Sequence, residues 1–205
     1  MSNIIAIKNI RDICTQALVA IGFQRRKTGI LTYKIDDTFQ GWVGLNDATR
    51  QSPDAMFVNP MIGIRADQIH QLIAKVEDKK THPYIPPTVV KNVGYLTPEN
   101  KFFSYEFPYN EDPSARALRM ATDVRQFGVP YIQANASLSA MVNLLPGWIW
   151  EEASERLLVA YYLQGKSKKF LLDFIQQRIN SGKQEKRFWQ RFEAFANKFR
   201  ERMLV

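Results

Sequence analysis

The chain has 205 residues, of which 45% are hydrophobic and 23% are charged, and this balance excludes global disorder. A chain of this length can bury a substantial core without cross-links to hold it together. The net charge of +8 is concentrated at one end: residues 166–205 contain 11 Lys and Arg against 4 Asp and Glu, whereas residues 1–165 contain 17 against 16. This asymmetry indicates either an anionic partner for the C-terminal segment or a solvated helix face.

The cysteine content and the first residues are typical of a cytoplasmic protein. Cys14 is the single cysteine, so the chain can form no internal disulfide and no zinc site built from several cysteines. Lys8 and Arg11 interrupt the apolar N-terminal residues, which excludes a signal-peptide pattern. Since no stretch approaches about 18 uncharged apolar residues, we also expect no transmembrane segment.

The first half of the chain predicts helices alternating with groups of strands. A helix is expected over residues 3–21, with Cys14 on its buried stripe and Gly22 at its end. Strands are then expected over residues 30–36, 39–45 and 55–64, followed by a helix over residues 66–78. Two more strands follow over residues 88–96 and 102–107, joined by a turn at residues 97–100 that contains Pro98.

The second half is predicted to be mostly helical. A helix begins at Asp112-Pro113, and Gly128-Val129-Pro130 breaks or ends it. Further helices are expected over residues 135–145, 150–164, 167–180 and 184–203. Because the strands cluster early and short turns link most of them, the pattern favours an α+β fold. We expect a mainly antiparallel sheet of about five strands with helices on one face, followed by a helical C-terminal region.

A domain boundary is expected at Pro146-Gly147. It would separate an α+β body, residues 1–146, from a basic helical region, residues 147–205, that packs on the body.

The sequence contains no familiar catalytic motif. The ten glycines build neither a phosphate-binding loop nor a dinucleotide-binding fingerprint, and no nucleophile elbow or paired-histidine zinc motif occurs. His70 falls within a predicted helix, where a structural histidine is the more common case, and His82 precedes a proline in a loop. We therefore predict no catalytic residues, no bound metal and no cofactor, which favours binding over catalysis.

The C-terminal helix carries the most distinctive pattern. Phe188, Phe192, Phe195 and Phe199 recur at steps of 4, 3 and 4 and predict a continuous stripe that packs on the preceding helices. On a neighbouring face lie four basic residues, Arg187, Arg191, Lys198 and Arg202. We expect these four to form an outward-facing ridge that binds an acidic partner, with a solvated face or an anionic membrane surface as the alternatives.

A short segment near the N-terminus resembles a known class of proteins. Residues 22–27, Gly-Phe-Gln-Arg-Arg-Lys, are followed by residues 31–34, Leu-Thr-Tyr-Lys. This order of a helix, a Gly-Phe with basic residues and an aromatic strand resembles uncharacterised bacterial families of small α+β domains. Some of those look like immunity proteins that accompany secreted toxins. The resemblance covers about 15 residues, implies a defence-related binding role and carries over no site residue.

Two binding functions and one catalytic function remain open from the sequence. The first is a cytoplasmic protein, such as an immunity protein, that binds and blocks a partner protein with an acidic surface. Its anchors would be exposed aromatic residues, with Trp42, Tyr84, Tyr109 and Trp150 as candidates. The second is a nucleic-acid-binding protein that uses the basic C-terminal helix. The third, an enzyme with an unfamiliar active site, is the least favoured.

Overall fold

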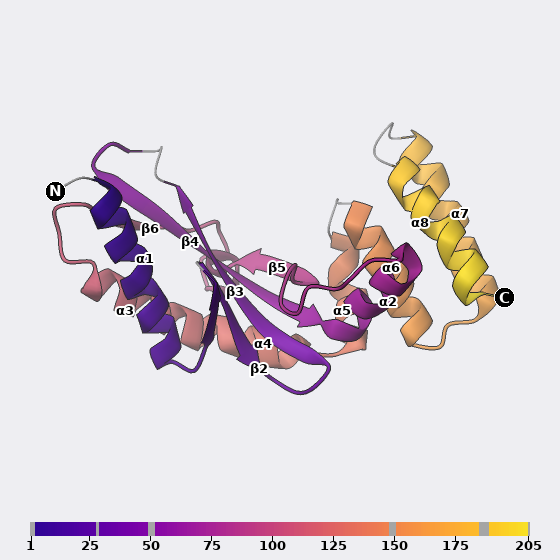
Figure 1. Ribbon diagram of the computed structural model, residues 1–205, viewed down its shortest axis with the longest axis horizontal. Coiled ribbons are helices and arrows are strands. Elements are labelled where there is room, and N and C mark those ends of the chain that lie inside the picture. The colour runs from indigo at the N-terminus through magenta and orange to yellow at the C-terminus, as the bar shows by residue number, and fades with distance from the viewer. Residues whose placement is uncertain (1–2, 28, 49–51, 148–150, 185–188, 205) are drawn as a thin grey trace. The chain divides into compact units, whose positions relative to one another are not determined.

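The computed structural model describes residues 3–27, 29–48, 52–147, 151–184 and 189–204 (Figure 1). Their contacts divide the chain into two compact units. The first contains residues 1–65 and 90–136, and the second contains residues 66–89 and 137–205. This division does not coincide with the expected ranges 1–146 and 147–205, because the helix after the fourth strand and the helix before Pro146 belong with the C-terminal helices.

An open antiparallel sheet forms the centre of the first unit (Figure 1). Its strands follow the order β1-β2-β3-β4-β5, and β6 pairs with β4. The pairing is antiparallel between β1 and β2, between β2 and β3, where Thr32 faces Trp42, and between β4 and β6, where Phe57 faces Glu106. The strands are β1 (Gln24–Lys27), β2 (Ile30–Lys34), β3 (Phe39–Ala48), β4 (Ala55–Ala66), β5 (Val89–Asn92) and β6 (Tyr105–Pro108). The predicted fold class is therefore confirmed.

Two details of the sheet differ from the sequence prediction. Arg25-Arg26-Lys27 belongs to β1, whose side chains are all exposed, so that no apolar alternation marked it as a strand. Residues 93–96 form a 3-10 helix, η1 (Val93–Leu96), where the strand was expected to continue. The turn that follows does not close a hairpin, since β5 and β6 each pair with β4.

Helices cover the sheet of the first unit. They are α1 (Asn3–Ala20), α3 (Ser114–Asp123) and α4 (Val129–Asn135). Among them, α1 packs against α3, α3 against β6, and α4 against β3. Gly41 permits this last contact, because a Cβ there would lie 2.9 Å from Cγ2 of Ile132. Gly22, with φ +102°, ends α1 as predicted, since a left-handed residue terminates a helix at little cost when it is glycine.

A π-helical turn, η2 (Val124–Gly128), joins α3 to α4. The interruption expected at Gly128-Val129-Pro130 therefore takes the form of a π-helical turn, and the chain stays helical through it. Pro130 has no N–H, and in a regular α-helix its ring would clash with the carbonyl four residues earlier. The helix therefore widens into a π-helical turn before Pro130 and does not end there. The N–H of Val129 donates to the carbonyl of Val124, five residues back, and α4 begins with Pro130 in its first turn. Wide turns of this kind occur frequently at functional sites.

The second unit is a bundle of helices around α6. Its helices are α2 (Asp67–Glu77), α5 (Leu138–Leu144), α6 (Glu151–Leu163), α7 (Lys168–Gln184) and α8 (Trp189–Met203), with a short 3-10 turn, η3 (Leu145–Gly147), after α5. Each of the other four helices packs against α6, and residues 153–160 of α6 are all buried. Phe192, Phe195 and Phe199 are buried as predicted, whereas Phe188 lies outside the described residues. No helix in the described part of the chain is long and apolar enough to cross a membrane.

Candidate functional site

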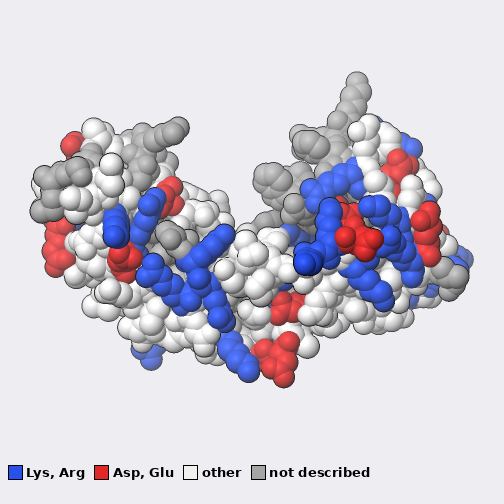
Figure 2. All heavy atoms as spheres, in the orientation of Figure 1, with Lys and Arg blue, Asp and Glu red and all other residues white. Residues whose placement is uncertain are grey.

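The packing of α2 against α8 brings together cations that lie more than 100 residues apart in the sequence. Figure 2 shows Lys and Arg side chains gathered around a small group of acidic side chains on this unit. We define the basic patch as the exposed cations of the α2 end and of α8: Lys75, Lys79, Lys80, Arg191, Lys198 and Arg202. Three of these residues, on α8, were predicted from the sequence, and the three lysines near the end of α2 were not.

Glu77 is the anion at the centre of the basic patch. Its carboxylate is paired with Lys79 and lies 3.7 Å from Nζ of Lys198. The hydrogen bond from Lys79 lowers the pKa of Glu77, and the charges of Lys79, Lys198 and Arg191 lower it further, against an opposing contribution from burial. One carboxylate therefore fixes the relative positions of cations from two helices.

Two of the cations of α8 are hydrogen-bonded to neighbouring helices and do not simply face outward, as the predicted ridge requires. Nε of Arg191 donates to Oε1 of Glu155 at 3.1 Å, and only 6% of the Glu155 side chain is exposed. Nη1 of Arg202 donates to the carbonyl oxygen of Lys75 at 3.0 Å. These contacts attach α8 to α6 and to α2, so the two arginines serve packing as well as displaying charge.

The other residues predicted to bind a partner are placed differently. Trp42 is only 8% exposed, which corrects its assignment as an exposed anchor. Its indole lies over Gly44, where a Cβ would come within 2.2 Å of the ring. Tyr84 and Tyr109 are half-buried. Arg187 and Trp150 lie outside the described residues.

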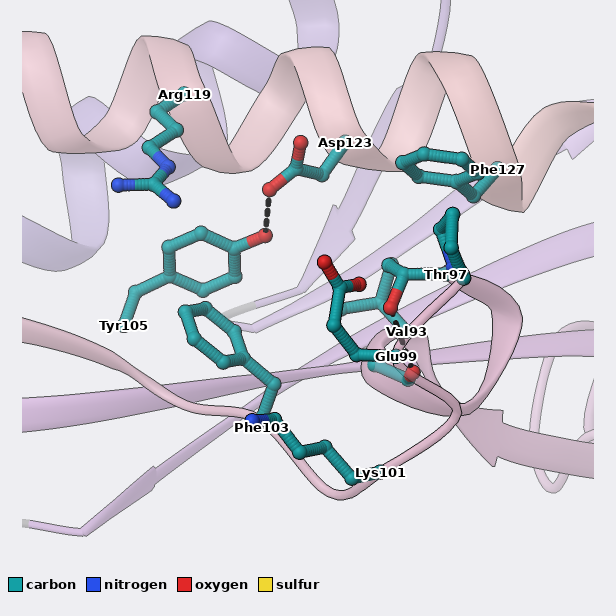
Figure 3. A pocket seen from close by; sticks show the side chains of 11 residues that line it. Val93, Thr97, Glu99, Lys101, Phe103, Tyr105, Arg119, Asp123 and Phe127 are labelled. Atoms are coloured by element: carbon teal, nitrogen blue, oxygen red, sulfur yellow. Dashed lines mark hydrogen bonds between the residues drawn. The ribbon is translucent and has the colours of Figure 1, made fainter.

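A pocket of about 380 Å³ opens in the first unit, between the loop before β6 and the helical segment formed by α3 and η2 (Figure 3). The buried side chain of Asn92 fixes the shape of the loop: Oδ1 accepts hydrogen bonds from the N–H groups of Gly94 and Phe103, and Nδ2 donates to the carbonyl of Phe103. Gly94 is required there, because a Cβ would lie 2.2 Å from the carbonyl oxygen of Lys101. The loop is therefore held rigidly by a buried polar side chain.

Aromatic rings and charged groups line this pocket. Phe103 comes from the loop, Tyr105 from β6 and Phe127 from η2. The hydroxyl of Tyr105 donates to Oδ2 of Asp123 at 2.5 Å. Burial, followed by the interaction with Asp123, raises the pKa of Tyr105 above its ordinary range. Within the described residues Asp123 forms no ion pair with Arg119, although these two residues are four positions apart on α3.

The two histidines take structural positions in the second unit. Nε2 of His70 lies 3.0 Å from Oγ1 of the fully buried Thr88, which also accepts a hydrogen bond from the N–H of Ala66. Arg156 donates to the carbonyl of Thr88 at 2.9 Å. His82 accepts from the N–H of Tyr84, and the two rings meet edge to face. In the described residues, no group of three His, Cys, Asp or Glu side chains could hold a metal ion.

Sequence reasoning missed the lysines of α2 and the whole pocket. Lys75, Lys79 and Lys80 stand close together in the sequence, but only the pairing of α2 with α8 joins them to the basic helix. The sequence contained only a weak indication of the pocket. The Thr97–Asn100 turn was recognised, yet its role as a pocket wall depends on the π-helical turn opposite.

Comparison of the chain with protein-family models, with curated proteins and with solved structures gave no match. The resemblance to bacterial immunity-like families therefore stays a prediction.

Proposed function

We propose that this protein acts by binding, and that the basic patch of α2 and α8 contacts an acidic surface of a partner protein. The observation that carries the proposal is that exposed cations from the α2 end and from α8 meet on one surface, where Lys79 and Lys198 share the carboxylate of Glu77. Such a field speeds association with an acidic partner and selects against basic ones. The hydrogen bonds of Arg191 and Arg202 hold the patch in place before a partner arrives.

Two features favour a protein partner over a nucleic acid. The patch contains Glu77 at its centre, and a carboxylate there opposes a continuous row of phosphates but suits a protein surface of mixed charge. Three aromatic residues of α8 are also committed to the core: Phe192, Phe195 and Phe199 are at most 3% exposed and offer no face for base stacking. The half-buried ring of Trp189, also on α8, is already covered by Nζ of Lys183, 4.8 Å from its centre. Nucleic-acid binding by the basic helix is accordingly the alternative outcome of the test.

The nature of the partner rests on the sequence resemblance. Because residues 22–34 resemble the opening of immunity-like bacterial domains, we propose a toxin as the partner and inhibition by physical blocking as the mechanism. A blocking protein needs a rigid complementary surface and no chemistry of its own. Of the two aromatic candidates that remain partly exposed, Tyr84 belongs to the same unit as the basic patch and would supply apolar contact at such an interface, whereas Tyr109 belongs to the first unit.

The test compares two variants that lose the same number of charges from the same unit. Lys80→Gln with Lys198→Gln weakens the basic patch, whereas Lys168→Gln with Lys169→Gln removes two exposed cations from the first turn of α7. Each variant and the wild type capture partners from extract of the native host, and mass spectrometry identifies them. The captured protein is then purified, and its association rate is measured at low and high salt.

The proposal predicts a captured acidic protein that associates about tenfold more slowly with the patch variant, while the α7 variant matches the wild type. The difference should shrink as salt screens the charges. Equal loss in both variants would show that only net charge matters and would contradict the proposal. The alternative function, nucleic-acid binding, would be established if only nucleic acid is captured. In that case nuclease should release it from the wild type, and the patch variant should not capture it.

A further inference from the structure

We propose that the pocket between the 93–103 loop and the α3–η2 segment binds an organic cation, an alkylammonium or guanidinium group carried by a free amine or by a Lys or Arg side chain. This site lies entirely within the first unit. It is independent of the basic patch, and its ligand has the opposite charge from the acidic partner proposed above.

The walls of the pocket are suited to a cation of side-chain size. The rings of Phe103, Tyr105 and Phe127 come from three different segments and border the same space (Figure 3). The face of an aromatic ring carries negative potential and attracts a cation that lies within about 6 Å of its centre. A volume of about 380 Å³ falls at the small end of the range for ligand sites and admits an alkylammonium group.

The positions of the charged groups in the pocket also favour a cation. In Figure 3 the carboxylate of Glu99 points into the space between the rings and that of Asp123 turns toward the hydroxyl of Tyr105, whereas the side chain of Lys101 extends away from the pocket. Arg119 lies at the Tyr105 end. The four charges cancel in sum, so the argument rests on their positions: the negative groups border the space that a ligand would fill.

The contact between Tyr105 and Asp123 keeps the site ready for a cation. Tyr105 uses its hydroxyl proton to hold Oδ2 of Asp123, which fixes the carboxylate in place and leaves its charge to attract a cationic ligand. The buried phenol remains protonated at neutral pH, because burial, followed by the contact with Asp123, raises its pKa. A negative oxygen is thus fixed beside aromatic rings before any ligand arrives.

The loop that bears Glu99 and Phe103 is also fixed in advance. Asn92 bonds to the backbone on both sides of the loop, and the carbonyl of Gly94 accepts from the N–H groups of Thr97 and Lys101 and from the hydroxyl of Thr97. Preorganisation of this kind lowers the ordering cost of binding. The pocket therefore combines a defined shape with a defined charge pattern.

The experiment uses the full chain and two probes of nearly identical shape. Choline carries a quaternary ammonium, and 3,3-dimethyl-1-butanol is its neutral carbon isostere. Ligand-observed NMR titration, up to concentrations of about 10 mM, covers the weak affinity expected of ligands this small. A short peptide with a central trimethyllysine is titrated alongside, so that binding tighter than that of choline identifies a side chain as the natural source and equal binding identifies a free amine.

Matched variants locate the binding. Asp123→Asn keeps an acceptor for Tyr105 but removes the charge, and Glu99→Gln changes only an exposed side chain of the loop. Asp37→Asn is the control, because the Asp37 side chain is 96% exposed and lies outside the pocket. Thermal melts establish that each variant is folded, and Glu99→Gln keeps the test decisive if Asp123→Asn unfolds.

We expect choline to bind at least about tenfold more tightly than its neutral isostere, since the isostere loses both the ring and the carboxylate attraction. Asp123→Asn and Glu99→Gln should each weaken choline binding several-fold, and Asp37→Asn should not. Equal binding of the two probes, no binding of either, or unchanged affinity in both pocket variants would overturn the assignment.

Discussion

Arg191 on α8 reaches across to Glu155 on α6, with 3.1 Å between Nε and Oε1, and the exposure of the two side chains is strongly unequal. The arginine side chain is 56% exposed, whereas only 6% of the glutamate side chain is. A buried carboxylate loses its hydration on folding and depends on its hydrogen-bond partners to remain charged. The arginine thus matters more for the carboxylate beneath it than for the charge that it displays to solvent.

Reversing Arg191 to Glu should therefore destabilise the protein, against the simple expectation that a surface charge on a basic ridge can be exchanged freely. We expect a loss of about 1–3 kcal/mol, since a hydrogen bond to a buried charged group is removed and a like charge is placed beside it. The control is Lys198→Gln, whose exposed charge should contribute less than about 0.5 kcal/mol. Urea unfolding of both variants measures the difference, and equal midpoints would show that Glu155 does not depend on Arg191.

Glu77→Gln should alter the acid limb of the stability curve. The pKa of Glu77 is lowered in the folded protein, first by the hydrogen bond from Lys79. Its contribution to stability is thus fully present above its ordinary pKa of 4.5 and is lost as the pH falls through the lowered value. Thermal melts of wild type and variant should converge below that window and separate above it. Curves that stay parallel throughout would contradict this role.

The same substitution should strengthen the proposed binding, because Glu77 is the anion within the basic patch. Removing its charge makes the field of the basic patch more positive, so association with an acidic partner should accelerate severalfold at low salt. A partner that binds the Glu77→Gln variant more slowly would show that the carboxylate helps to form the interface.

Gly44→Ala should destabilise the sheet by about 1–3 kcal/mol, because the added methyl would overlap the Trp42 indole and force it from its position. The clashing atoms belong to the six-membered ring of the Trp42 indole. The side chain of phenylalanine is shorter and has no atoms that far from its backbone. The double variant Gly44→Ala with Trp42→Phe should thus recover part of the loss seen when the two single effects are added. Denaturant titrations of all four proteins complete the cycle, and strict additivity would rule out the overlap.

Cys14 should resist thiol reagents in the folded protein. Its side chain is 0% exposed, and burial raises the pKa of its thiol to about 12, so almost no thiolate forms at neutral pH. An Ellman's reagent assay should show negligible labelling before urea is added and one equivalent afterwards. Rapid labelling under native conditions would indicate that α1 opens readily.

The sequence predicted the elements that have strong local signals. Ile10, Cys14 and Leu18 on α1 are buried as expected, and so are Phe192, Phe195 and Phe199 on α8, since helical periodicity reflects one packed face. Leu118 shows where periodicity misled. Its helical spacing from Ala121 would place it on an apolar stripe of α3, but it is 65% exposed, and α3 also buries the smaller Ala117 together with Met120.

The candidate sites were harder to predict, because each depends on contacts between distant segments. Lys198 of α8 meets Glu77 of α2 across 121 positions of sequence, and no local pattern encodes that distance. The pocket likewise requires Phe127 to stand opposite Phe103, a position reached only because the backbone widens before Pro130. Side-chain types could be read from the sequence, whereas their grouping came from tertiary structure.

The interleaved composition of the two units has a consequence for synthesis on the ribosome. The second unit takes α2 from residues 66–89 and its remaining helices from residues 137–205, so α2 emerges long before the helices that cover it. Its buried face, with Ile69 and Val76, has no native cover until α6 and α8 have left the exit tunnel. A nascent chain stalled before α8 should accordingly recruit chaperones at α2, and release of the final helix should end that association.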